Sequence, residues 1–192
     1  MPAPKWKEKK KRRIQKCIKE ILTELGYDTK DENFKHTPQR VATQWFDELY
    51  RPIPSRKLFT VIKEQHDQMI VLVGHETWTR CPHHLEKVKL TVSIGYIPNE
   101  YILGLSKPAR IADFFAKGLV LQEEYADQLA EGLWQALKPK GVGVYVIGEH
   151  GCMRSRGVKT SGVVVTTSLK GLFLEDPATR EEFLNYCQRR VQ

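Results

Sequence analysis

A thiol and two imidazoles lie within four positions in the segment CPHH, residues 81–84, and this cluster constrains the fold more than any other feature. Cys81 and His84 are separated by two residues, so both could bind one metal ion. They supply only half of a tetrahedral site, and further ligands must come from elsewhere. The remaining candidates, His150 and Cys152, lie far along the chain, so only folding could bring all four side chains together.

Two kinds of zinc site fit these residues. A closed structural site has four protein ligands, whereas a catalytic site has three and keeps one position for water. With Cys81, His84 and Cys152 as ligands, His83 and His150 would lie beside the ion. Two thiolates make zinc a weak Lewis acid, so neighbouring histidines that titrate near neutral pH would have a role in proton transfer. Spacing alone leaves both kinds of site open.

Composition places the chain among ordinary globular proteins. Of its 192 residues 41% are hydrophobic and 28% are charged, which suits one domain with a terminal extension. No apolar run approaches the ~20 residues of a membrane span, and the charged N-terminus does not resemble a secretory signal. We therefore expect a cytoplasmic protein with no membrane partner, whose four cysteines are thiols or metal ligands and not disulfides.

The positive charge is concentrated at the N-terminal end. Residues 1–16 carry +7 of the net charge of +8, so the remaining sequence is nearly neutral. A block of like charges is typical of a solvated, partly disordered arm. We therefore expect such an arm, and nucleic acid is an unlikely partner for the protein as a whole.

Hydrophobic periodicity predicts an α+β protein. A basic arm and helical region is expected over residues 1–55, a domain with the candidate zinc ligands over 56–175 and a C-terminal helix over 176–192. Strands, two helices and further strands follow one another in the central part, an order typical of an antiparallel sheet with both helices on one face. Helices are expected over 14–25, 37–49 and 122–137 and from about 106 and 177, and strands over 69–73, 85–97, 142–147 and 162–168.

The segment LSKPAR predicts a helix start that could bind an anion. Ser106 would be the N-cap, and Lys107 and Arg110 would stand one turn apart beside the exposed amides. Arg156, just after the possible metal ligands, is expected to add positive charge to the same place. One ligand with a polyphosphate and a group that reacts at zinc would use both features, whereas simple helix capping is the alternative.

The helix expected to start at Gln122 has a carboxylate in its first turn. Glu123 could accept hydrogen bonds from the N1–H and the exocyclic amine of guanine, because an ionised carboxylate offers two acceptor oxygens. An ordinary acid on the helix surface is the alternative interpretation.

Five segments together resemble the GTP cyclohydrolase I family, in one register from about Thr37 to Phe173. The resemblance implies the tunnelling fold (T-fold) and a Zn²⁺-dependent hydrolysis of GTP at purine C8, which yields 7,8-dihydroneopterin triphosphate and formate. This is the first step of tetrahydrofolate (pterin) or 7-deazaguanine synthesis. The family assembles as a homodecamer with active sites between subunits. The segments are CPHH, IGYIPNEYILGLSKPARI, LQEEYADQLAEGLWQAL, GVGVYVIGEHGCMRSRG and VTTSLKGLF.

The resemblance also implies roles for individual residues. Zinc ligands are implied at Cys81, His84 and Cys152, and catalytic histidines at His83 and His150. The residues implied to bind GTP are Ser106, Lys107, Arg110, Arg156 and Arg40 for the triphosphate, and Glu123 with the adjacent Gln122 for guanine.

Two other functions compete with this one. A nitrile reductase of the same fold would need an unliganded nucleophilic cysteine and a nicotinamide site, and the sequence has no fingerprint of such a site. A non-catalytic, zinc-stabilised T-fold protein that binds nucleotides or nucleic acid would need a closed metal site and salt-dependent polyanion binding.

Overall fold

The structure is a computed structural model that describes residues 4–188 and divides into two compact units. The first unit ends at Tyr50 and the second begins at Arg51. The boundaries expected at residues 55 and 175 stay predictions. Among the described residues, every helix is too short or too polar to cross a membrane.

The N-terminal unit is a pair of helices, α1 (Lys5–Glu24) and α2 (Thr37–Leu49). The expectation of a partly disordered basic arm is wrong for most of that segment, because α1 already begins at Lys5. Lysine and arginine are good helix formers. Trp6 also anchors the start of α1, since its ring packs edge-on against the rings of Phe46 in α2 and of Tyr50 just after α2.

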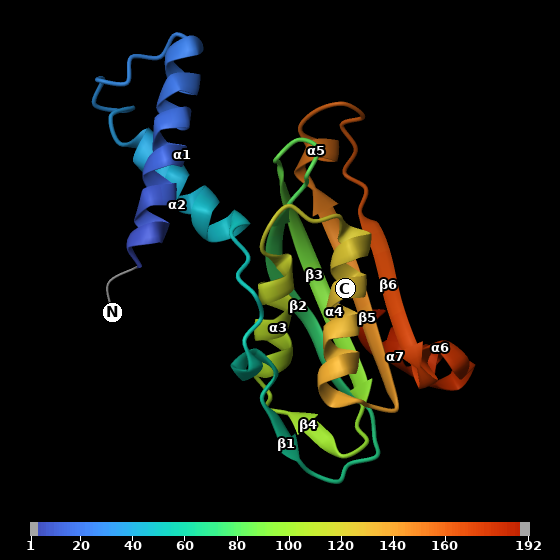
Figure 1. Ribbon diagram of the computed structural model, residues 1–192. Coiled ribbons are helices and arrows are strands. Elements are labelled where there is room, and N and C mark those ends of the chain that lie inside the picture. Colours follow the sequence, from blue (N-terminus) through green and yellow to red (C-terminus); the bar gives the residue numbers. More distant parts are fainter. Residues whose placement is uncertain (1–3, 189–192) are drawn as a thin grey trace. The chain divides into compact units, whose positions relative to one another are not determined.

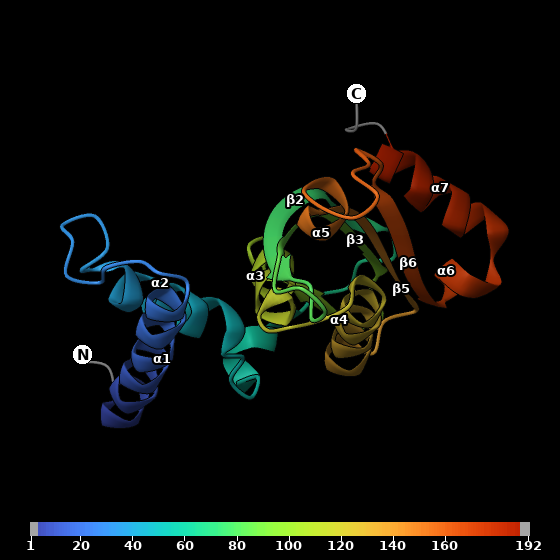
Figure 2. The ribbon, with the colours of Figure 1, turned by 90° about the horizontal axis from the view of Figure 1, so that it is seen from above.

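The second unit is built on a four-stranded antiparallel sheet of order β2-β3-β5-β6. In Figure 2, which views the strands end-on, α3 and α4 lie on one side of the sheet, and α6 and α7 lie beside its other side. The expected α+β fold with two helices on one face is therefore confirmed. The elements are η1 (Arg56–Phe59), β1 (Val61–Lys63), β2 (Ile70–Arg80), β3 (Lys87–Ile97), β4 (Tyr101–Leu103), α3 (Lys107–Ala116), α4 (Gln122–Leu137), β5 (Gly141–His150), α5 (Gly151–Arg154), β6 (Val164–Gly171), α6 (Leu172–Glu175) and α7 (Pro177–Gln188).

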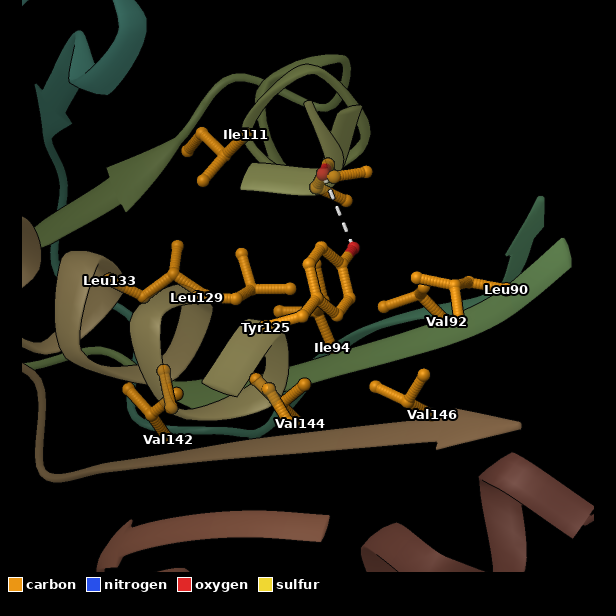
Figure 3. Packing of buried hydrophobic residues seen from close by; sticks show 14 of the residues in the cluster. Leu90, Val92, Ile94, Ile111, Tyr125, Leu129, Leu133, Val142, Val144 and Val146 are labelled. Carbon is orange, nitrogen blue, oxygen red and sulfur yellow. Dashed lines mark hydrogen bonds between the residues drawn. The ribbon is translucent and has the colours of Figure 1, made fainter. Parts of the chain in front are cut away.

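The main core lies between the sheet and the two helices α3 and α4 (Figure 3). Alternate residues of β3 point to this side, because successive side chains of a strand face opposite ways. Leucines of α4 spaced by four residues meet them. The hydroxyl of the fully buried Tyr125 donates a hydrogen bond to the carbonyl of Ala112 at 3.2 Å, which ties α4 to α3.

Strand β2 is longer than the sequence predicted. The apolar run that indicated a strand ends at Val73, whereas β2 continues to Arg80. The register shifts between Leu72 and His75, and the residues that follow are largely polar. A bulge and a polar strand face hide the second half of the strand from a hydrophobic pattern.

The direction of the strands sets the two ends of this unit. β3 and β5 pair from Val88 with His150 at one end to Ile97 with Gly141 at the other. We call the first the metal end and the second the far end. Figure 1 shows α5 at the metal end, whereas β1 and β4 lie at the far end.

Candidate active site

The hairpin loop between β2 and β3 holds Cys81 and His84 on one turn. The amide of Cys81 donates to the carbonyl of Glu86 at 2.9 Å, and the amide of Leu85 donates to the carbonyl of Cys81 at 2.9 Å. Leu85 has a φ of 57°, a left-handed conformation that closes the turn. Cys81 is buried and His84 is exposed, so the loop offers one ligand on the core side and one on the solvent side.

The third residue of the group arrives from the end of β5. A Cβ on Gly151 would lie 2.7 Å from the carbonyl oxygen of Lys87, so only glycine allows the chain to approach the hairpin this closely. The next residue is Cys152, in the short helix α5. One ligand atom each from Cys81, His84 and Cys152 then lies within 4.8 Å of the other two.

These three side chains fit a zinc ion. Zinc–sulfur and zinc–nitrogen bonds are roughly 2.0–2.3 Å long, so small side-chain rotations would bring all three to one ion. The pKa of Cys152 is raised by burial and, in addition, by the neighbouring thiol of Cys81. Two thiols at such short range favour a cation between them, because a bound cation stabilises both thiolates.

Two further histidines line a cavity of about 180 Å³ beside this group. Nδ1 of His83 lies 3.9 Å from Sγ of Cys81. Nε2 of His150 lies 2.8 Å from Oε1 of Gln122. Burial lowers the pKa of His150, although the charge of Glu123 opposes that shift. His150 therefore tends to be neutral and able to accept a proton.

Cys152 reaches this cavity from a short helix and not from a strand. In an extended strand, residues 150 and 152 would share one face. In the structure β5 ends at His150, and Cys152 lies in α5. Both nevertheless line the cavity, because the chain turns sharply at Gly151.

The two residues at the start of α4 have different surroundings. Glu123 is exposed and lines the cavity, with its carboxylate available to a ligand. Gln122 is buried, and its amide nitrogen donates to the carbonyls of Val146 at 3.3 Å and Val164 at 2.9 Å. Gln122 therefore belongs to the wall of the site, and Glu123 belongs to its opening.

The start of α3 lies at the far end, away from the metal group. Ser106 precedes α3 soon after β4, and α3 runs back along the sheet so that Leu119, which follows it, bridges to Arg80. The LSKPAR segment was expected to lie beside the metal ligands. Within a single chain this expectation is wrong. β3 spans 11 residues at ~3.3 Å each, so the two ends are roughly 30 Å apart.

The side chains of the expected anion site have no ligand-like arrangement in one chain. Ser106 holds the N-cap position, yet its hydroxyl makes no capping hydrogen bond. Nζ of Lys107 donates to the carbonyl of Lys57 at 2.6 Å, and Arg110 is exposed. Arg156 is exposed in the loop after α5, at the metal end. Arg40 is an exposed residue of α2 in the N-terminal unit.

Several residues of the cavity wall escaped the sequence analysis. Val88 was predicted as a strand residue, and its position two residues after the hairpin loop could have placed it in the wall. Gly148 and Gly151, which flank the EH pair, are the sequence signal of a close backbone approach. The wall residues without an assigned role are Thr79, Pro82, Val88, Val120 and Leu121.

The fold and the site define the class of protein first. A T-fold unit carries a cysteine–histidine–cysteine group that could hold a metal, beside a cavity with two more histidines. The sequence pattern of GTP cyclohydrolase I matches residues 14–188, which is most of the chain. The chain belongs to the GTP cyclohydrolase I family and is an enzyme with GTP cyclohydrolase activity.

Curated relatives agree with this assignment. The GTP cyclohydrolase 1 of Rattus norvegicus is 42% identical over 168 residues, which cover 85% of this chain and 70% of that protein. That of Wolinella succinogenes is 39% identical and covers 94% of this chain and 99% of the relative. That of Saccharomyces cerevisiae is 41% identical, with coverages of 98% and 80%. Similarity of this extent favours the enzyme over a non-catalytic binding protein.

Proposed function

We propose that this enzyme hydrolyses GTP at purine C8 and rearranges the product to 7,8-dihydroneopterin triphosphate and formate, with Zn²⁺ as its cofactor. The observation that carries the proposal is the group of Cys81, His84 and Cys152 within 4.8 Å, next to two histidines that are not part of it. A catalytic zinc site has three protein ligands, and histidines that do not bind the ion can lie beside it. A closed structural site has four protein ligands.

The proposed ligands are Cys81, His84 and Cys152. When bound, Zn²⁺ supplies Lewis acidity toward water and substrate oxygens. The chain's own contribution is proton transfer. His150, held neutral by burial, would accept and return a proton, and His83 at the exposed side of the cavity would assist at another step.

Glu123 is the proposed recognition residue for guanine. Its two carboxylate oxygens could accept hydrogen bonds from N1–H and the exocyclic amine, a pair of donors side by side in guanine. The cavity of about 180 Å³ is smaller than the roughly 300–1,000 Å³ of pockets for drug-sized ligands. We therefore infer that it takes the base, and that the triphosphate lies outside it.

The triphosphate contacts are proposed to come from two copies of the chain. Arg156 lies at the metal end of one copy, whereas Ser106, Lys107 and Arg110 lie roughly 30 Å away at its far end. A neighbouring copy could bring its own far end to this metal end. In the described residues the four-stranded sheet stops at β2 and β6, whose outer edges could pair with neighbours. Arg40 in the N-terminal unit is a further proposed contact.

This arrangement supports a homo-oligomer, and we propose the homodecamer of the family, located in the cytoplasm. The product would enter tetrahydrofolate or 7-deazaguanine synthesis. Both pathways begin from the same pterin triphosphate, so the site itself does not distinguish them.

The proposal is tested by incubating the purified protein with GTP. We expect formate and, after oxidation, a fluorescent pterin, with about one zinc ion bound per chain. Zinc at that ratio without formate would contradict the proposed reaction and favour a closed metal site. Formate release that survives complete zinc removal would contradict the proposed cofactor.

A further inference from the structure

The side chain of Gln122 is held from three directions. It lies in the first turn of α4 with only 3% of its surface exposed. Its amide nitrogen donates to the carbonyl of Val146 in β5 and to that of Val164 in β6. Its Oε1 lies 2.8 Å from Nε2 of His150. Both N–H groups of the amide are thus used by the backbone, and neither is left for a nucleotide.

These partners fix which way the amide points. Backbone carbonyls only accept hydrogen bonds, so the atom that faces them must be the amide nitrogen. The atom that faces His150 is then the amide oxygen, which only accepts. Nε2 of His150 must therefore donate, and it must carry a proton.

We propose that Gln122 is a positioning residue, which holds His150 in the tautomer protonated at Nε2 and leaves Nδ1 as the nitrogen that accepts a proton. The inference rests on the proposed catalytic role of His150 and adds to it the identity of the reacting nitrogen. Because Gln122 is attached to two strands through backbone carbonyls, it also fixes the plane of the imidazole.

Gly148 provides independent support for this arrangement. A Cβ at this position would overlap Oε1 of Gln122 and would lie 3.0 Å from Nε2 of His150. Real Cβ atoms do not approach other atoms so closely, so an alanine here must displace the amide. The hydrogen bond between Gln122 and His150 thus depends on a residue that takes no part in it.

The first test separates positioning from substrate binding. Gln122→Met keeps the side-chain volume and removes the acceptor. Gly148→Ala displaces the amide of Gln122 but changes neither Gln122 nor His150 chemically. We expect each variant to lose about tenfold to a hundredfold in kcat, part of what proton transfer contributes, with zinc content and KM for GTP unchanged. Gln135→Met, at an exposed position of the same helix, is the matched control and should retain full activity.

The second test reads the tautomer without reference to activity. Solid-state ¹⁵N NMR of the histidine-labelled full chain, with His150→Ala to assign the signals, should show Nε2 protonated and Nδ1 unprotonated at neutral pH. In Gln122→Met the two tautomers should become mixed. Since the wild-type spectrum alone decides the tautomer, the test survives a variant that fails to fold.

Each outcome has a defined meaning. A raised KM with unchanged kcat in Gln122→Met would overturn the inference, because it would make Gln122 a nucleotide contact. A wild-type spectrum with Nδ1 protonated would overturn it directly. If His150→Ala kept full turnover, the catalytic role in the proposed function would be wrong, whereas the spectrum would still decide whether Gln122 sets the tautomer.

Discussion

The metal end and the far end of the second unit differ in how complete they are. At the metal end, neighbouring antiparallel strands place Cys81, His84 and Cys152 together within one chain. At the far end, Lys107 donates a hydrogen bond to a backbone carbonyl and Arg110 is exposed to solvent. Under the proposed function, one chain would prepare the metal and base parts of the site, and a second copy would supply the phosphate part.

The largest expected effect is the loss of a metal ligand. Cys152→Ala should lose bound zinc and more than about a hundredfold of activity, because changes that only support metal ligands already cost ~10–100-fold. Zinc is measured by elemental analysis and turnover by formate release. Cys17→Ala, on the exposed face of α1, is the matched control. A variant that retains zinc would remove Cys152 from the ligand set.

His150→Ala should separate catalysis from metal binding. We expect turnover to fall about 10²–10⁴-fold, the contribution of a general acid–base group, while zinc content stays at the wild-type level. The same two measurements apply. Loss of zinc would instead make His150 a fourth ligand and the site a closed one, and the metal end would then be structural.

The comparison of the two ends predicts complementation between subunits. Lys107→Ala removes a far-end cation and Cys152→Ala removes a metal-end ligand, so each variant alone should have little activity. Oligomers that contain both, co-expressed with two tags and purified through each, should recover about a quarter of wild-type activity, since random mixing leaves that share of sites intact.

The absence of any recovery would contradict a shared site. It would mean that both ends of one chain serve the same GTP molecule, because no site in a mixed oligomer would then be intact. Lys57→Ala is a suitable control for Lys107→Ala, because Lys57 contacts it only through a backbone carbonyl. Mixed oligomers of Lys57→Ala and Cys152→Ala should show only the activity of their intact metal ends.

Much of the fold and of the metal group could be predicted from the sequence. Apolar residues spaced by four predicted α4 with both its ends, and a proline in the first turn marked α2. The metal group was predictable because few residue types bind zinc and their number in the chain is small. The chemistry of zinc ligands therefore narrowed the candidate ligands to a few cysteines and histidines before their positions were known.

The rest depended on contacts that leave no pattern in the sequence. The place of Ser106 relative to the metal follows from the path of α3 across the sheet. The role of Gln122 follows from backbone carbonyls, which every residue has. The helical start of α1 depends on Trp6 packing against aromatic rings more than 30 positions away. Long-range packing decided each of these features.

The smallest expected effect concerns a buried thiol that is not part of the metal group. It shows what burial alone does to the pKa of a cysteine in this unit. Cys187 of α7 is 2% exposed, and burial raises its pKa to about 11 from an ordinary value of 9.0. The thiol ionises earlier in the unfolded chain than in the folded protein. Its contribution to stability is therefore complete below pH 9.0 and is lost as the pH rises through about 11.

Denaturant unfolding between pH 8 and pH 11 measures this contribution. A difference of two pKa units corresponds to about 3 kcal/mol at most, so the free energy of unfolding of Cys187→Ala should fall less steeply with pH than that of the wild type. Tyr96 and Tyr125, whose pKa values are also raised by burial, titrate in both proteins and cancel in the comparison. Equal slopes would show that Cys187 ionises as easily in the folded protein as in the unfolded chain. Burial would then not raise the pKa of this thiol.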